Sequence, residues 1–184
     1  MANTAHKNMP DSQLHEVKGA ATAAAGKMPI ANGTGLAPFS YANPIGATSF
    51  INNAVPFSMT SPTVYTKVNP VTTALGVAIE VTEGTNARLT YTGTRTSIFK
   101  INAVISLIQS TASNKNIAVK LYKNAGAIAH SEVFQTFVSN VTHEIALSAI
   151  VPMATNDFIE CYVVTESGDL LIKGLYLDMI GVRG

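Results

Sequence analysis

Regular alternation of apolar and polar side chains restricts the fold of this chain more than any other feature of its sequence. Apolar residues occupy every second position in four stretches, 77–82, 99–107, 117–122 and 145–151. A period of two over so many residues predicts β-strands rather than helices. Short sequences rich in Gly, Asn, Asp and Ser separate the stretches, so that strands recur about every 8–14 residues, as in all-β sandwiches. We therefore expect an all-β protein built as an antiparallel β-sandwich.

Helix is only weakly indicated. Residues 12–25 could form one, with Asp11 or Ser12 as the N-cap, although Gly19 and Thr22 weaken that expectation. The sequence has no convincing strand–helix–strand units, which argues against a Rossmann or barrel enzyme.

The sequence holds no complete motif for catalysis, cofactor binding or metal binding. Residues 19–27 have the wrong spacing for a phosphate-binding loop, and residues 33–38 lack the third glycine of a dinucleotide loop. Asp157 and Asp169 fall in predicted turns, where a calcium site would need a denser set of oxygen ligands, and Cys161 is expected to be a small buried side chain. The four histidines are His6, His15, His130 and His143, and no two of them have the spacing of metal ligands. We predict a protein that is not an enzyme and needs neither a cofactor nor a metal ion.

The charge balance excludes further classes. Only 12% of the 184 residues are charged and the formal net charge is +1, whereas nucleic-acid binding needs a basic patch to meet the phosphates. The N-terminus has no apolar core of the kind found in a secretory signal, and no apolar run approaches the length of a membrane span. We therefore expect no nucleic-acid partner, no membrane association and folding in the cytosol.

Residues 28–66 contain no charged side chain and five prolines, which argues against a long helix or a central strand. Spaced apolar and aromatic residues such as Ile30 and Phe39 would be sticky in water. This predicts an extended arm that lies against its own domain, a sister subunit or another protein; the alternative is an ordinary irregular loop packed on its own core. We expect a mostly irregular N-terminal arm over residues 1–57, followed by a β-domain over residues 58–184.

Two late strands are apolar on both faces. In residues 158–164, Tyr162 and its neighbours are apolar or aromatic at nearly every position. In residues 170–180, alternation places Leu171, Leu175, Leu177 and Met179 on one face and Leu170, Ile172, Tyr176 and Ile180 on the other. A two-sheet sandwich buries only one face of each strand, so the second face needs a cover. We favour a subunit interface that includes Tyr162, Leu175 and Tyr176, and the alternative is that the N-terminal arm covers this face.

Three segments in order carry a family resemblance: residues 87–108, 117–131 and 155–164. They contain a Gly-Thr turn before a long strand, the hairpin sequence Leu-Tyr-Lys-Asn-Ala-Gly, and Asp157 at the opening of a later strand. The pattern resembles the jelly-roll domain shared by tumour necrosis factor and the complement globular head, which is similar to that of many bacteriophage virion proteins. The resemblance covers roughly residues 64–184 and implies an antiparallel jelly-roll β-sandwich that assembles as a homotrimer. Asn156 stands where the usual pattern has glycine.

Residues 11–35 resemble the start of phage head-fibre and decoration proteins, in which a Leu-His-Glu-x-Lys-Gly element precedes an alanine-rich run. Leu14, His15, Glu16, Lys18 and Gly19 match that element, with Val17 at its variable position. The resemblance implies that the N-terminal part docks on the major capsid protein or another virion protein. The capsid-docking residues would be Leu14, His15, Glu16, Val17, Lys18, Gly19, Ile30 and Phe39.

Together these patterns predict a structural virion protein, assembled in the host cytoplasm, that decorates or stabilises a bacteriophage capsid. The alternative is a receptor- or carbohydrate-binding tip of a phage fibre or tail, although the absence of Trp weakens a sugar-stacking site. A small polysaccharide-active enzyme is the third possibility; it would need two converging carboxylates, and the sequence holds only eleven acidic residues, scattered among turns.

Overall fold

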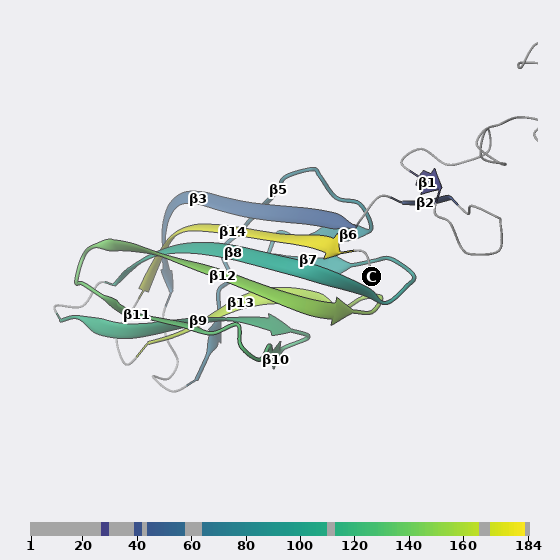
Figure 1. Cartoon of the computed structure of the whole chain (residues 1–184). Coiled ribbons are helices and arrows are strands. Elements are labelled where there is room, and N and C mark those ends of the chain that lie inside the picture. Colours follow the sequence, from purple (N-terminus) through teal and green to yellow (C-terminus); the bar gives the residue numbers. More distant parts are fainter. Residues whose placement is uncertain are drawn as a thin grey trace, which may run out of the picture. The chain divides into compact units, whose positions relative to one another are not determined.

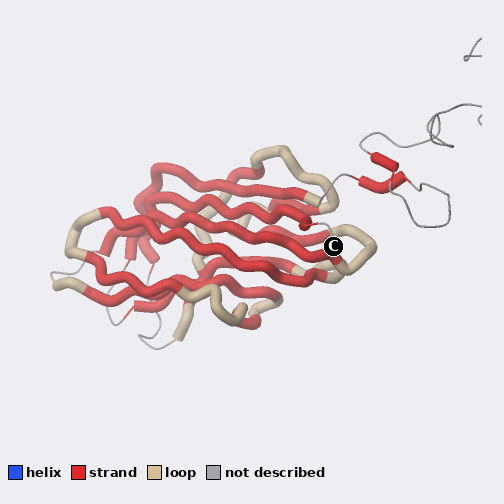
Figure 2. Tube along the Cα trace, viewed as in Figure 1, coloured by secondary structure: helices blue, strands red, loops and turns tan. Residues whose placement is uncertain are grey.

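The computed structural model describes residues 27–29, 39–41, 44–57, 64–109, 113–165 and 170–182. The chain forms two compact units, Met1–Ala42 and Asn43–Gly184. In the first unit, strands β1 (Lys27–Pro29) and β2 (Phe39–Tyr41) pair antiparallel. The second unit is a two-sheet sandwich, and every regular element among the described residues is a strand (Figure 2). The described residues include no helix long and apolar enough to cross a membrane.

One sheet of the sandwich has five strands in the order β12-β8-β14-β3-β5, and we call it the five-stranded sheet. Its long strands lie side by side in Figure 1. Their bounds are β3 (Ile45–Phe57), β5 (Thr73–Ala74), β8 (Ser97–Gln109), β12 (Thr142–Met153) and β14 (Leu170–Val182). Strand β14 is central and pairs with β8 on one side and β3 on the other.

The second sheet has seven strands, and we call it the seven-stranded sheet. Its path is β10-β9-β13-β7-β6, with β11 also paired to β9 and β4 also paired to β13. The bounds are β4 (Thr66–Lys67), β6 (Val81–Glu83), β7 (Arg88–Tyr91), β9 (Lys115–Lys123), β10 (Gly126–Ala127), β11 (Val133–Phe137) and β13 (Phe158–Thr165). From β7 to β14 the chain repeatedly crosses from one sheet to the other, which gives the antiparallel jelly roll that the sequence predicted.

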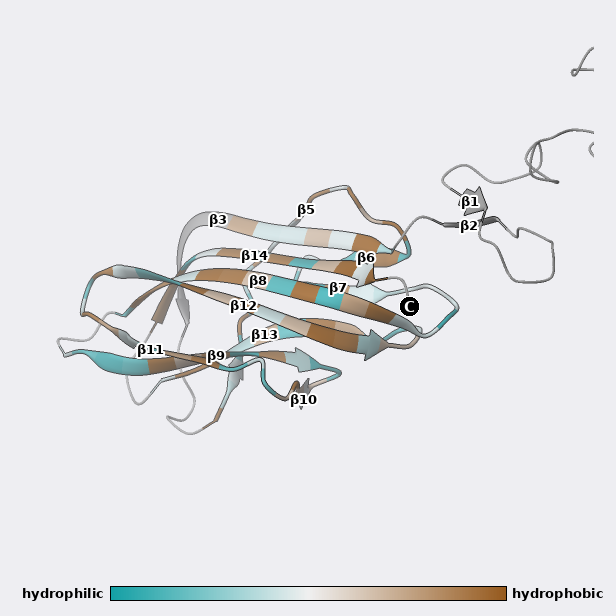
Figure 3. Cartoon of the chain, in the orientation of Figure 1, coloured by the Kyte–Doolittle hydropathy of each residue, from teal (hydrophilic) through white to brown (hydrophobic). Residues whose placement is uncertain are grey.

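The core lies between the two sheets and is built from the alternating positions that the sequence indicated. On β8, Phe99, Ile101, Ala103, Ile105 and Leu107 are all fully buried, and Figure 3 shows apolar and polar segments alternating along this strand. The facing sheet contributes Leu121 from β9 and Ile159 and Val163 from β13, which are also fully buried. Cys161 lies among them as the small buried side chain that was expected.

The boundary between arm and domain differs from the expected one. Residues 45–57 were assigned to the arm because of their prolines and lack of charge, but they form strand β3, which pairs with β14 and contributes the buried Ala47 and Phe50. The unit boundary therefore falls at Ala42, fifteen residues before the predicted one. Pro56 is tolerated because it sits next to the end of β3 rather than in its middle. The suggested helix at 12–25 lies outside the described residues.

The expected faces of β14 are also corrected. The register of β14 shifts between Ile172 and Gly174 on both of its sides, which marks a β-bulge. A bulge inserts a residue and reverses which side chains face inward. As a result Leu170 and Ile172 are buried in the core together with Leu175, Leu177 and Met179.

The turn before β13 explains the asparagine that replaces the usual glycine. Asn156 has a φ of 70°, a left-handed conformation that Gly and Asn adopt more readily than other residues. The carboxylate of Asp157 accepts hydrogen bonds from the backbone of Ala154 at 2.8 Å and from the side chain of Lys123 at 3.2 Å. These backbone and side-chain hydrogen bonds lower the pKa of Asp157 and outweigh the opposing effect of desolvation.

Candidate subunit interface

The outward-facing side chains of β14, β8 and β12 form a continuous surface, which we call the outer face of the five-stranded sheet. Antiparallel register places one residue from each strand in a transverse row, and side chains within a row touch. Consecutive outward rows along the sheet are Val182–Ile98–Pro152, Ile180–Lys100–Ile150, Asp178–Asn102–Ser148, Tyr176–Val104–Ala146 and Gly174–Ser106–Glu144.

The first two rows lie at one end of the sheet and are apolar at every position except Lys100, which is exposed between Ile180 and Ile150. Ile150 is 72% exposed, and Ile98, Ile180 and Val182 are each more than one-third exposed. In the fourth row Tyr176 is 40% exposed beside Val104. Isolated exposed apolar residues are normal on a monomer, but a contiguous group of this kind marks an interaction surface.

The third row is polar and hydrogen-bonded across three strands. Asn102 Nδ2 donates to Asp178 Oδ1 at 2.8 Å, and Ser148 Oγ donates to Asn102 Oδ1 at 3.3 Å. Asp178 is only 8% exposed although it points to the outer face. Burial, followed by the negative charge of Asp178 and a hydrogen bond to it, raises the pKa of Tyr176 above its usual value.

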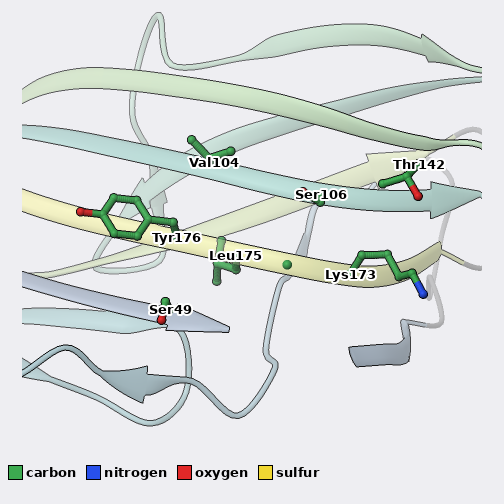
Figure 4. A pocket seen from close by; sticks show the side chains of 8 residues that line it. Ser49, Val104, Ser106, Thr142, Lys173, Leu175 and Tyr176 are labelled. Carbon is green, nitrogen blue, oxygen red and sulfur yellow. The ribbon is translucent and has the colours of Figure 1, made fainter. Parts of the chain in front are cut away.

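Beside the bulge the outer face is hollowed. The hollow has a volume of about 580 Å³ and is lined by side chains from β3, β8, β12 and β14 (Figure 4). Small residues from three adjacent strands, Ser49, Gly174 and Ser106, leave this gap. Val104 and Tyr176 supply its apolar wall, the almost fully buried Leu175 also borders it, and Lys173 and Thr142 lie at its border.

The predicted interface residues do not lie together. Tyr176 is on the outer face and 40% exposed. Leu175 is 2% exposed and packs in the core of its own chain, so it is not available to another subunit. Tyr162 lies on β13 in the other sheet. Of the predicted capsid-docking residues, Phe39 is in β2, paired with Pro29; Leu14, His15, Glu16, Val17, Lys18, Gly19 and Ile30 lie outside the described residues.

The second apolar face of residues 158–164 is covered by the chain's own side chains. Tyr162 stacks on Tyr122 with ring centroids 3.9 Å apart, and Tyr65 packs against Tyr122 at 6.1 Å. The hydroxyl of Tyr65 is hydrogen-bonded to Glu132. Side chains of the same chain, Tyr122 from β9 and Tyr65 from just before β4, therefore cover part of this face of β13. Sequence reasoning missed this cover because Tyr65 lies almost 100 residues before Tyr162.

A buried carboxylate fixes the same region. Glu160 is 1% exposed and forms ion pairs with Lys67 at 2.5 Å and Arg88 at 2.7 Å. The Arg88 guanidinium also lies 3.9 Å from the centroid of the Phe158 ring. Two cations around one carboxylate compensate for its removal from water, so this cluster acts as a structural tie between β13, β4 and β7.

In the part of the chain that the structure describes, no three His, Cys, Asp or Glu side chains lie close enough together to hold a metal ion. Burial, followed by the charge of Glu160, raises the pKa of Cys161 to about 12. The thiol is thus protonated at neutral pH, and it is fully buried.

Comparison with known proteins identifies the fold. No protein-family model and no curated protein matches the chain. Among solved structures, PRD1 vertex protein P5 superimposes with a TM-score of 0.52 at 10% identity, over 88% of this chain and 84% of that one. The two share a fold. An Eiger TNF from S. frugiperda also matches, with a TM-score of 0.47 at 14% identity, over 76% of this chain and 94% of that one. Murine APRIL at pH 5.0 matches with a TM-score of 0.47 at 8% identity, over 77% of this chain and 100% of that one.

Proposed function

We propose that this chain is a structural protein of a bacteriophage virion that decorates or stabilises the capsid as a homotrimer. The observation that carries the proposal is the outer face of the five-stranded sheet, where apolar side chains from three strands lie exposed in register. A surface of this kind on a stable sandwich calls for a partner. The fold that the chain shares with a phage vertex protein supports a place in the virion.

The free energy gained by covering the outer face can be estimated. The exposed parts of Ile98, Val104, Ile150, Tyr176, Ile180 and Val182 together equal nearly three whole side chains. At about 1.5–3 kcal/mol per buried side chain, covering them is worth roughly 4–8 kcal/mol. Association costs about 4–15 kcal/mol in lost freedom, so one such face is marginal alone. The surface that meets it on the neighbouring subunit must contribute as well, and a closed trimer makes three contacts instead of one.

We further propose that the N-terminal residues dock on the shell, through the segment that contains Leu14, His15, Glu16, Val17, Lys18 and Gly19 and through Ile30 and Phe39. One arm has to be ordered at about 1–2 kcal/mol per residue, which makes single attachment weak. Three arms on one trimer bind at high effective concentration once the first has bound. Trimerisation would thus turn a marginal contact into a durable one.

The role proposed here is non-enzymatic. Four charged side chains on the seven-stranded sheet or beside it, Lys67, Arg88, Lys120 and Lys123, are held in ion pairs with acidic partners. Such pairing suits a structural part, since a catalytic acid or base needs a group poised to exchange protons with a substrate.

Two measurements test the proposal. Light scattering on the purified chain at micromolar concentration should return three times the 19.3 kDa chain mass; a monomer mass would contradict it. Electron microscopy of virions should place the protein on the capsid surface at a copy number that follows the shell symmetry. Density only at the tip of a fibre or tail would favour a receptor- or carbohydrate-binding role instead.

A further inference from the structure

Four aromatic side chains gather on the outward face of the seven-stranded sheet. Tyr162 of β13 stacks on Tyr122 of β9, and Tyr65 packs against Tyr122 from just before β4. Phe134 of β11 faces the same side, because it pairs with Ala118, which lies four residues before Tyr122 on β9. We call the four aromatic residues the aromatic strip. It spans three adjacent strands, a width of about 10 Å at the usual strand spacing.

The rings of the aromatic strip are open to water and held in place. Phe134 is 70% exposed, and the three tyrosines are partly exposed. Ala118 beside Phe134 offers only a methyl group to cover that ring. The hydroxyl of Tyr65 is hydrogen-bonded to Glu132, and the other two tyrosine rings hold each other by stacking. Aromatic groups fixed in this way lose little conformational freedom when a ligand binds.

Polar side chains flank Phe134 on both sides along the strand direction. Glu132 lies just before β11 and pairs with Lys120 at 3.4 Å. Beyond Phe134, Thr136 Oγ1 donates to Asn116 Oδ1 at 2.8 Å, and both of these residues are exposed. A carboxylate, an ammonium group, a hydroxyl and an amide thus surround one exposed aromatic ring. Such groups suit a ligand that combines a flat apolar surface with a rim of hydrogen-bonding groups.

The charges beside the aromatic strip balance each other. Lys120 is paired with Glu132, and the buried Glu160 holds both Lys67 and Arg88. These ion pairs leave little net charge on this face, whereas a nucleic acid needs cations that are available to its phosphates. A protein partner would need a larger apolar area than one exposed ring with polar groups around it. The face is therefore best matched by a neutral ligand that is rich in hydroxyl groups.

We propose that the aromatic strip binds a neutral oligosaccharide, with one pyranose ring stacked on Phe134 and the sugar chain continuing towards the tyrosines. A pyranose presents C–H bonds on its faces and hydroxyl groups around its rim. The C–H bonds carry partial positive charge, which the negative face of an aromatic ring attracts. The rim hydroxyls are within the chemistry of Lys120, Glu132 and Thr136, which donate or accept hydrogen bonds. Phenylalanine and tyrosine supply the flat surface in a chain that has no tryptophan.

The inference goes beyond the proposed capsid role and does not rest on the homotrimer. The aromatic strip belongs to the seven-stranded sheet, whereas the candidate subunit interface lies on the five-stranded sheet. Sugar binding by this face would therefore be expected of a monomer and of a trimer alike.

Binding can be followed by intrinsic tyrosine fluorescence, because the chain has six tyrosines and no tryptophan. The full chain is titrated with maltohexaose, cellohexaose, laminarihexaose and chitohexaose, each up to about 10 mM. At least one of these sugars should give a saturable change, since three of the six tyrosines lie in the aromatic strip. Isothermal titration calorimetry with that sugar then gives the dissociation constant for each variant.

Substitutions at Phe134 separate ring stacking from simple apolar contact. Phe134→Tyr keeps the flat ring and should leave the dissociation constant within about 2-fold. Phe134→Leu keeps an apolar side chain without a ring, and it should raise the dissociation constant by about 3- to 10-fold, as should Phe134→Ala. The 70% exposure of Phe134 means that none of these variants should unfold the chain, which circular dichroism checks. Val71→Ala, at a valine that is 78% exposed before β5, is the control and should bind as the wild type does.

Each possible failure has a distinct meaning. If none of the four sugars gives a saturable change, the proposal is overturned. If Phe134→Ala binds as tightly as the wild type, the sugar lies elsewhere and the aromatic strip is not its site. If Phe134→Leu binds as tightly as the wild type, the contact is not ring stacking, and this outcome also overturns the proposal. Light scattering on the same samples tests the homotrimer separately, because a monomer mass would contradict the proposed function without changing the expected sugar affinity.

Discussion

Removal of residues 1–57 should abolish folding, whereas removal of residues 1–42 should not. The longer deletion takes away β3, which pairs with the central strand β14 through ten residue pairs. Such a ladder holds about ten backbone hydrogen bonds, each worth roughly 0.5–1.5 kcal/mol net. The buried Phe50 and Ala47 add roughly 2–4 kcal/mol of lost burial. The total is about 7–19 kcal/mol, which matches or exceeds the 5–15 kcal/mol stability of a typical domain.

The assay is thermal unfolding followed by circular dichroism, with light scattering on the same samples. The variant that begins at residue 43 should melt cooperatively within a few degrees of the full chain, stay trimeric and fail to bind particles that lack the native protein. The variant that begins at residue 58 should show no cooperative transition. A folded product from the shorter chain, with an unchanged melting temperature, would refute the reasoning about β3.

Further predictions concern single sites. Glu160→Gln should lower the free energy of unfolding in urea by about 3–5 kcal/mol, because Lys67 and Arg88 lose their shared carboxylate. The lower end is the expected value, since both cations are partly exposed to water. An unchanged urea midpoint would contradict the role of this cluster. Cys161 should resist thiol reagents at pH 8 in the native protein and react fully in urea. Because its pKa rises from 9.0 to about 12 on folding, the folded state keeps a proton that the unfolded state loses, so stability should fall as pH rises from 9 towards 12; urea midpoints that stay level across this range would oppose that assignment. Ile150→Asp should prevent trimer formation without unfolding the monomer, measured by sedimentation and circular dichroism, since Ile150 is 72% exposed on the outer face. A chelator should leave the melting temperature unchanged, and a large drop would reveal an ion site.

The sequence predicted the sandwich well because alternation reports directly which side of a strand is buried. Phe99, Ile101 and Leu107 on β8 were assigned to the core on this basis and lie there. Prediction failed where a single residue changes the register. The bulge near Gly174 has no sequence signature that alternation alone can detect, and it moved Leu170 and Ile172 inward.

The candidate interface was predicted only in part. Tyr176 lies at an outward position and is 40% exposed, and its place in an interface stays a prediction. Leu175 was misplaced, since a strand that is apolar on both faces does not reveal which face turns inward. Tyr162 was expected to need a second subunit, but Tyr122 and Tyr65 pack beside it. Contacts between residues this far apart in sequence depend on strand order, which periodicity does not encode.

The central position of β14 has a consequence for how the chain acquires its structure. Its partners β3 and β8 are separated from it by more than 100 and about 60 residues, so the pairings at the centre of the five-stranded sheet join segments that are far apart in the sequence. Folding that depends on such distant pairings is slow. During synthesis, β3 and β8 emerge long before the strand that joins them, and each then presents an unpaired edge. A β14 strand already made by a neighbouring chain can pair with these edges before the chain's own β14 emerges. A swapped product should therefore become more abundant as expression becomes faster, and slower synthesis at lower temperature should reduce its share.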